Sequence, residues 1–484
     1  MTRLLAALAA VVLGCALQIS DGRLDPIALP LVLLAGVLAV LAAKRARADD
    51  TEAPEVAREG REGAAPEQDP ERAARLRLWT QIVLGGGCAA GLVCTLLARP
   101  THFVPDAQLG PIRALALLAL LVLSAYLCVH LRPAFLRARF GLLLALAFAM
   151  GAAVIQRAPR PWIDVWYFQQ LGSEALVAGE NPYRLGYPDL YSASGLPFND
   201  PRLLRDGKFY GLPYPPLVVL LATPARLLFG DVRFLHLIAL VVAAAAVARL
   251  GRKAEDPVTA ELAGLFIALQ PRALFVIEQT WTEPAGLALF ALAALAALRW
   301  TRAAREPRAG RWPLELVLCG VTLGLAAAIK QYMPLVLLPL FVALPRVGRF
   351  RVAVLAGLIV LATFAPFAIW DLREMVYGVI WMNVVQPLRL DALSVLAVLA
   401  LLVPTARWMA ALGFAAAFAL LAAFWPRPGR LAAATLSAGA AFLWFLLLNK
   451  QAFCNYYFFA VGVLCVACAL PSRAKLLATP GAPR

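Results

Sequence analysis

In this 484-residue sequence, the side chains whose types and spacing best suit catalysis or binding lie in residues 157–216. The segment is polar and lies between long apolar runs that are typical of membrane-spanning helices. Such helices satisfy their own backbone hydrogen bonds, so a polar loop between them is where extramembrane catalysis or recognition is expected. Its aromatic and acidic residues are Trp162, Trp166, Tyr167, Tyr183, Tyr187, Tyr191, Tyr210, Tyr214, Asp164, Glu174, Glu180, Asp189, Asp200 and Asp206.

The composition predicts a polytopic membrane protein. Hydrophobic residues make up 62% of the chain, charged residues only 15%, and the mean hydropathy is +0.75. These values lie well outside the range of soluble globular domains. The net charge of +16 does not indicate nucleic-acid binding, because the basic residues are scattered at the ends of apolar runs. Charges placed in this way set membrane topology.

Cysteine and histidine give no sign of a metal or redox site. Cys465 and Cys468 form a CxxC motif, but it lies within the apolar run VGVLCVACAL and is interpreted as packing. The three histidines have no paired spacing, so no zinc site is predicted. The other cysteines are Cys15, Cys88, Cys94, Cys128, Cys319 and Cys454.

The first part of the chain is expected to form two membrane hairpins joined by a linker. Residues 1–43 form an N-terminal transmembrane hairpin, although the run 4–19 could also be a signal peptide. Residues 44–78, rich in Ala, Glu, Arg and Pro, are expected to be a disordered or loosely helical cytoplasmic linker. Residues 79–137 add further transmembrane helices.

Alternating basic loops then predict about fourteen transmembrane helices with both termini inside. Residues 138–470 form the main module, with an extracytoplasmic loop at 157–230 that carries juxtamembrane helices, and residues 471–484 form a cytoplasmic tail. The stretches 215–229 and 374–389 are expected to lie in the interface, and 392–403 is too short to cross comfortably. The spans after the loop are expected at 233–248, 258–277, 284–300, 314–329, 333–344, 352–370, 406–425, 431–448 and 456–470.

This topology brings polar residues from several helix ends to the outer face. Each alone is explained by helix capping or by anchoring at the interface. Acids, a lysine and amides delivered to one face by separate helices are functional candidates, because ionisable groups near the membrane are costly. They are Asp164, Glu278, Glu283, Lys330, Gln331, Tyr332, Asp371, Asp391, Lys450 and Gln451.

Several motifs occur in a distinctive order. WIDVWYFQ contains Asp164, Gly-Glu-Asn-Pro-Tyr follows at 179–183, and Tyr-Pro-Pro-Leu at 214–217 opens the interfacial stretch. Three helix-end segments follow: IEQTWTEP (277–284), AAIKQYMPLVLLPL (327–340) and NKQAFCNYYFF (449–459). This order resembles the type-C glycosyltransferases (GT-C), most closely the mannosyltransferase-like group of family 87. The resemblance covers about residues 138–470 and leaves out the first four spans.

The resemblance implies an inverting membrane glycosyltransferase. Such an enzyme takes mannose or another hexose or pentose from a polyprenyl-phosphate donor and transfers it to a glycolipid, glycan or protein acceptor of the cell envelope. The reaction takes place on the extracytoplasmic face of a bacterial inner (plasma) membrane. Asp164 matches the catalytic base, and a carboxylate suits removal of the acceptor's hydroxyl proton. The substrate-binding residues expected are Tyr167, Glu180, Asn181, Tyr183, Tyr214, Glu278, Glu283, Lys330, Gln331, Tyr332, Lys450, Asn455 and Tyr456.

Other interpretations of the same residues remain open at this stage. Asp164 could be only a first-turn acid of the helix that follows it, and Glu278 and Glu283 could cap the helix at Pro284. Some type-C relatives have a double acid where Asp164 stands between Ile163 and Val165. A divalent metal therefore stays an open alternative without support from such a motif, and no other cofactor is assigned. A transporter or flippase of lipid-linked sugars is the main alternative, although no internal repeat between halves is visible. A glycan polymerase or ligase would share the outer loop.

Overall fold

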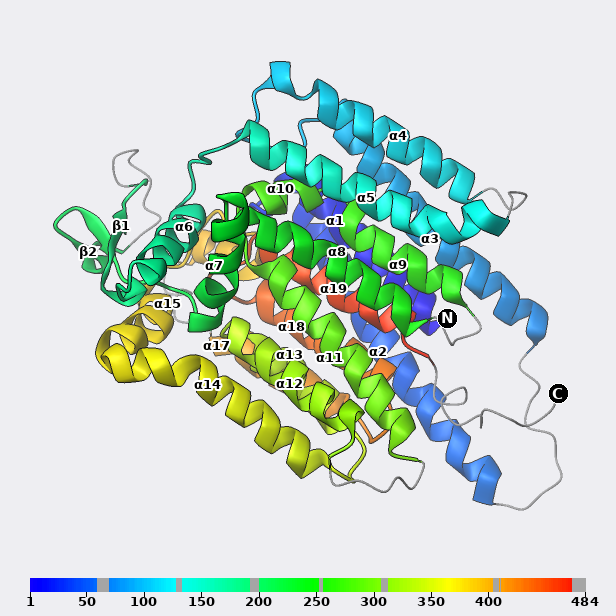
Figure 1. Cartoon of the computed structure of the whole chain (residues 1–484). Coiled ribbons are helices and arrows are strands. Elements are labelled where there is room, and N and C mark those ends of the chain that lie inside the picture. Colours follow the sequence, from blue (N-terminus) through cyan, green and yellow to red (C-terminus); the bar gives the residue numbers. More distant parts are fainter. Residues whose placement is uncertain are drawn as a thin grey trace.

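The computed structural model of this chain is built almost entirely from helices (Figure 1). It describes residues 1–58, 69–127, 133–191, 200–251, 256–305, 312–403, 409 and 411–471. Within these ranges, eight helices are long and apolar enough to cross a membrane. They are α1 (Thr2–Ser20), α2 (Ala28–Arg58), α3 (Pro70–Leu97), α4 (Gly110–Leu127), α5 (Pro133–Arg157), α8 (Arg233–Leu250), α11 (Glu283–Ala303) and α14 (Arg349–Val376). The expected class, an all-helical membrane protein, is confirmed at this level.

Shorter helices fill the remainder of the described bundle. The apolar ones are α7 (Pro216–Phe229), α9 (Pro257–Leu269), α12 (Leu314–Ile329), α13 (Met333–Val342), α17 (Ala411–Ala423), α18 (Leu431–Leu447) and α19 (Cys454–Ala469). The other short helices are α6 (Asp164–Val177), α10 (Ala273–Glu278), α15 (Met382–Val385) and α16 (Val395–Leu402), and a π-helical turn, Tyr377–Trp381, precedes α15. Because several of these are shorter than a bilayer is thick, the count of about fourteen crossings stays a prediction.

An almost fully buried helix forms the centre of the bundle, and glycine allows close helix contacts around it. Helix α19 is buried along nearly its whole length and lies among α1, α9, α11 and α18 (Figure 1). A helix that is apolar on every side belongs in such a position. Elsewhere, a Cβ at Gly91 of α3 would lie 1.8 Å from the carbonyl oxygen of Leu269. Glycine therefore lets α3 and α9 approach backbone to backbone, as small residues do between membrane helices.

One end of the bundle carries a small extra module. There α6, α7 and a three-stranded sheet of β1 (Gly186–Pro188), β2 (Leu204–Arg205) and β3 (Lys208–Tyr210) lie together (Figure 1). The strand order is β1-β3-β2, with antiparallel neighbours and Tyr187 opposite Phe209. Asp206 and Gly207, with φ of 51° and 70°, form the turn between β2 and β3. An Asp-Gly pair favours this tight hairpin turn, because both residues tolerate positive φ.

The module has its own hydrophobic core. Phe168 of α6 packs edge-on against Tyr187 and Phe209 of the sheet, with ring centroids 4.9 and 5.3 Å apart. Phe367 of α14 joins this cluster by contact with Tyr183, 5.9 Å away between centroids. Figure 1 shows α7 running across the ends of the bundle helices rather than along them. The interfacial position expected for 215–229 stays a prediction.

The structure decides between two alternatives for the linker and corrects one span expected from the sequence. The described parts of the linker 44–78 are helical, since α2 continues to Arg58 and α3 begins at Pro70, while residues 59–68 lie outside the described ranges. Alanine, glutamate and arginine are strong helix formers, which explains the extension. The single span expected at 258–277 is two helices, α9 and α10, because Pro271 follows Gln270 and holds it in an extended conformation. Cys128 and most of the tail 471–484 also lie outside the described ranges.

Candidate functional site

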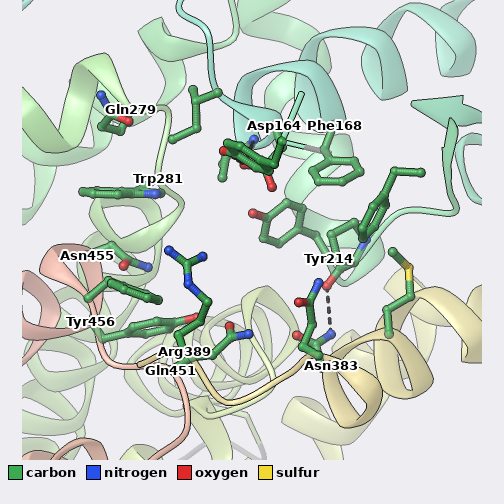
Figure 2. Close-up of a pocket in the computed structure, with 18 of the residues that line it drawn as sticks. Asp164, Phe168, Tyr214, Gln279, Trp281, Asn383, Arg389, Gln451, Asn455 and Tyr456 are labelled. Atoms are coloured by element: carbon green, nitrogen blue, oxygen red, sulfur yellow. Dashed lines mark hydrogen bonds between the residues drawn. The ribbon is translucent and has the colours of Figure 1, made fainter. Parts of the chain in front are cut away.

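A cavity of about 450 Å³ lies where the extra module meets the bundle. Asp164 reaches it from α6, Trp281 from the turn between α10 and α11, and Arg389 from the segment between α15 and α16. Asn455 and Tyr456 reach it from the start of α19. Figure 2 shows these side chains around one hollow, with the guanidinium of Arg389 extending into its middle. Segments far apart in the sequence thus converge on Asp164.

Asp164 is the half-buried first residue of α6. Its Oδ1 atom accepts hydrogen bonds from the backbone N–H of Val165 at 2.8 Å and from the hydroxyl of Tyr191 at 3.1 Å. No other described residue donates a hydrogen bond to Oδ2. Burial raises the pKa of this carboxyl above its usual range, and the Tyr191 hydrogen bond acts in the opposite direction. A carboxylate with a raised pKa and an available oxygen is a suitable general base.

Arg389 supplies positive charge to the same cavity. Its guanidinium forms two parallel hydrogen bonds with Asp391, Nε to Oδ1 at 2.7 Å and Nη2 to Oδ2 at 2.8 Å. Its Cζ atom also lies 4.8 Å from the ring centroid of Phe453. The charge of Arg389 lowers the pKa of Asp164 and so favours the ionised carboxylate. Arg389 and Tyr191 therefore both act on the pKa of Asp164 within this cavity.

Lys330 is buried in a ring of tyrosines at the end of α12. Its Nζ donates hydrogen bonds to Thr282 Oγ1 at 2.7 Å and to Glu283 Oε1 at 2.8 Å. The same atom lies 5.3 Å from the ring centroid of Tyr214 and 5.5 Å from that of Tyr456. A buried ion pair of this kind fixes both side chains, because either charge alone would be costly in such a setting.

A larger groove of about 1720 Å³ adjoins the cavity. Its apolar walls come from α13, α17, α18 and the segment before α16. Its apolar lining residues include Pro334, Leu335, Leu338, Leu390, Phe414, Phe418, Phe445 and Leu446. Lys450 lies on its polar side, where Nζ donates hydrogen bonds to the carbonyl oxygens of Val384 at 2.8 Å and Gln386 at 2.7 Å. Burial lowers the pKa of Lys450.

Eight residues line both the cavity and the groove, and we call them the neck. They are Arg23, Lys330, Gln331, Asn383, Gln386, Arg389, Gln451 and Tyr456. Three of them are cations, four are amides and one is a tyrosine, so none of these described lining residues is an acid. Gln331 and Asn383 both donate to the carbonyl oxygen of Pro213, at 3.1 and 3.2 Å, which ties the neck to the extra module. A lining of cations and amides suits an anionic group.

The structure brings together most of the polar residues expected at one face. Asp164, Tyr214, Lys330, Gln331, Asn455 and Tyr456 line the cavity, and Tyr332 and Lys450 line the groove. Gln451 lies in the neck, and Asp391 lies in the groove beside it. Asp371 lies apart from both and pairs with Arg184, with Nε 2.6 Å from Oδ2.

Glu278 and Glu283, both expected to bind substrate, line neither the cavity nor the groove. The fully buried Glu278 accepts backbone hydrogen bonds from His102, Phe103 and Val104, at 2.6 to 3.1 Å. It therefore fixes the loop between α3 and α4, while Glu283 holds Lys330. Of the two, only Glu283 lies at the start of the helix at Pro284, as the first residue of α11.

Four further residues expected to bind substrate line neither the cavity nor the groove. Asn181 Oδ1 accepts from the backbone N–H of Tyr183 at 3.0 Å and begins a 3₁₀ turn. The hydroxyl of the buried Tyr183 donates to the carbonyl oxygen of Tyr214 at 2.7 Å. Glu180 is exposed and Tyr167 packs edge-on against Trp166, and neither lines the cavity. The Gly-Glu-Asn-Pro-Tyr segment is thus a structural turn, which Gly179 opens with a φ of 76°.

Several lining residues were not expected from the sequence. Trp281 lies within the motif IEQTWTEP, and Arg389 lies two residues before Asp391. The sequence around both residues therefore indicated a functional site. Tyr191 was noted only as one aromatic among many. Asp21, Arg23 and His102 come from the first four spans, outside the resembling segment, and only tertiary packing brings them to the cavity.

Comparisons and metal-site geometry add no assignment to this site. Among the described residues, no group of three or more His, Cys, Asp or Glu side chains could hold a metal ion. The scan against protein-family models, the search of curated proteins and the search of solved structures each gave no match for this chain. A function for this chain therefore has to be inferred from the chemistry of the site itself.

Proposed function

We propose that this chain is a membrane glycosyltransferase that moves a sugar from a polyprenyl-phosphate donor to a hydroxyl acceptor. The observation that carries the proposal is the order of three chemical environments. A polar cavity with a carboxylate leads through a cationic and amide-rich neck into a long apolar groove. A sugar, a phosphate and a prenyl chain follow one another in the same order in such a donor. The cations of the neck would pair with the phosphate, and the apolar groove would bury the prenyl chain, so the site suits this ligand class.

The reaction proposed is an inverting displacement at the anomeric carbon. The acceptor hydroxyl forms a bond to that carbon while the bond to the phosphate oxygen breaks, and Asp164 takes the hydroxyl proton. The polyprenyl phosphate leaves with the bonding electron pair, and its charge is stabilised by the cations of the neck. Trp281, Tyr214 and Tyr456 provide ring faces that suit sugar stacking. The acceptor would be a glycolipid, a glycan or a protein of the cell envelope.

We further propose that the site faces the extracytoplasmic side of the inner membrane. The segments 132–139, 299–311 and 346–351, at the ends of spans, are rich in arginine, and such segments stay in the cytoplasm. The cavity-lining turns are at the opposite ends of the adjoining spans.

Transfer by the purified protein in detergent tests the proposal. The substrates are a panel of radiolabelled polyprenyl-phosphate sugars with a bacterial membrane lipid extract as acceptor. Asp164→Asn keeps the shape of the side chain but removes the base, so turnover should fall by about 10²–10⁴-fold. Asp206→Asn is the matched control, because Asp206 is exposed in the β2–β3 turn, lines neither the cavity nor the groove, and asparagine tolerates its positive φ.

Two outcomes would contradict the proposal in different ways. Equal turnover by wild type and Asp164→Asn would remove the catalytic role of Asp164. An absence of product with every donor, together with movement of the labelled lipid across proteoliposomes that contain the protein, would make the chain a flippase of lipid-linked sugars.

A further inference from the structure

The turn between α1 and α2 brings Arg23 to the neck. Arg23 lines both the cavity and the groove, although it lies more than a hundred residues before Asp164 in the sequence. Its side chain is exposed, and no hydrogen bond or ion pair to a described residue occupies it. Its backbone pairs with Ala392, next to the segment that carries Arg389. The first hairpin of the chain thus forms one wall of the site.

This turn is firmly held in place. Gly22, with a φ of +74°, packs so closely on α19 that a Cβ there would lie 2.0 Å from the backbone nitrogen of Cys454. Next to it, Asp21 forms an ion pair with Arg272 and lies 3.2 Å from Nε2 of His102. The backbone N–H of Leu24 donates to the carbonyl oxygen of Asp391 at 2.8 Å. Arg23 is therefore presented by a fixed backbone, which lowers the entropic cost of binding a ligand.

The other cations of the neck already have partners. Lys330 is paired with Glu283 at 2.8 Å, and Arg389 is paired with Asp391 at 2.7 Å. Lys450 in the adjoining groove donates to two backbone carbonyl oxygens. Among the described cations that line the neck, Arg23 alone has no carboxylate partner. Its charge is consequently the one that a ligand's anion would neutralise.

We infer that Arg23 binds the phosphate of the amphiphilic substrate, so that the N-terminal hairpin completes the donor site. This inference rests on the proposed function, because it assigns the anion of the same donor. A guanidinium can form two parallel hydrogen bonds with phosphate oxygens, which an ammonium group cannot. Arg23 is outside the catalytic segment that the sequence motifs define, and its role is to bind and orient the leaving phosphate.

Binding of two matched lipids tests the inference. The probes are undecaprenyl phosphate and undecaprenol, its uncharged alcohol, titrated against the full-length protein in detergent with microscale thermophoresis. The variants are Arg23→Ala, Arg23→Lys and the control Arg47→Ala, which removes the same charge from an exposed position in the half of α2 farther along the chain from Arg23. Thermal unfolding without lipid checks that each variant is folded.

We expect wild type and Arg47→Ala to bind the phosphate more tightly than the alcohol. Arg23→Ala should lose about tenfold in affinity for the phosphate and keep its affinity for the alcohol, since one charge-assisted contact is worth about that factor. Arg23→Lys should lie between them. An unchanged preference in Arg23→Ala, or equal loss for both lipids, would overturn the role of Arg23. If wild type itself shows no preference, the proposed donor class fails and the assignment of Arg23 fails with it.

Discussion

At the scale of single residues, the pKa of Asp164 is subject to opposing effects. Burial raises the pKa of its carboxyl, while the hydroxyl of Tyr191 and the charge of Arg389 favour the ionised form. The sequence predicted Asp164 as a base because the order of the motifs around it resembles that of the type-C glycosyltransferases, in which an acid at the matching position acts as the base. It did not predict Tyr191 or Arg389 as its partners, because their proximity depends on how the loop folds against the bundle. Local motifs therefore indicate Asp164 as a candidate, but not the groups that shift the pKa of its carboxyl.

Removal of the Tyr191 hydroxyl should change the pH dependence of transfer. A base must be ionised, so the rate falls as the pH drops through its pKa, and burial places that fall above the usual range for aspartate. Tyr191→Phe removes a hydrogen bond that lowers the pKa of Asp164, so the acid limb should move to higher pH. The measurement is kcat/KM against pH. Tyr210→Phe, in β3 and away from the cavity, should leave the limb in place, and an unmoved limb in Tyr191→Phe would exclude the hydrogen bond as a cause.

At the scale of elements, the apolar runs identified nearly every helix, because length and hydropathy dominate the energetics of a membrane span. The one wrong span, and the choice between a disordered and a helical linker that the sequence left open, both have local causes. Pro271 was a visible signal for the break between α9 and α10, whereas the extension of α2 to Arg58 reflects helix propensity in a polar segment. The sheet β1–β3 was not foreseen, since its strands are too short for an alternating pattern. Elements set by packing rather than by composition were the ones missed.

The ends of α11 and α12 should be energetically coupled through Glu283 and Lys330. Both side chains are buried, so Glu283→Gln leaves the ammonium of Lys330 without its counter-charge. Loss of one partner of a buried pair costs about 3–5 kcal/mol. We expect Glu283→Gln and Lys330→Met each to lower the unfolding free energy in detergent, and the double variant to lose clearly less than their sum. Strictly additive losses would mean that the pair is not coupled.

At the scale of the whole molecule, turns from the entire chain meet at one end of the bundle. The α1–α2 turn, the α10–α11 turn and the start of α19 all line the cavity. At the opposite end, Arg3 near the N-terminus donates to the carbonyl oxygen of Leu470, and Thr2 to Asp49. The alternation of basic loops predicted that the polar helix ends share a face, and the structure brings most of them together. The contribution of the first hairpin could not be predicted, because no motif in it indicates the site.

The two ends of the bundle should lie on opposite sides of the membrane. Asp206→Cys places a thiol in the exposed β2–β3 turn, and Arg47→Cys places one on the far part of α2. In intact spheroplasts, a membrane-impermeant maleimide should label Asp206→Cys directly and Arg47→Cys only after permeabilisation, because arginine-rich ends remain in the cytoplasm. Wild type, with its own cysteines, is the background control. The reverse pattern would put Asp164 on the cytoplasmic side, where a nucleotide-sugar donor would become the better candidate. Labelling of both thiols from one side would contradict the separation of the two ends.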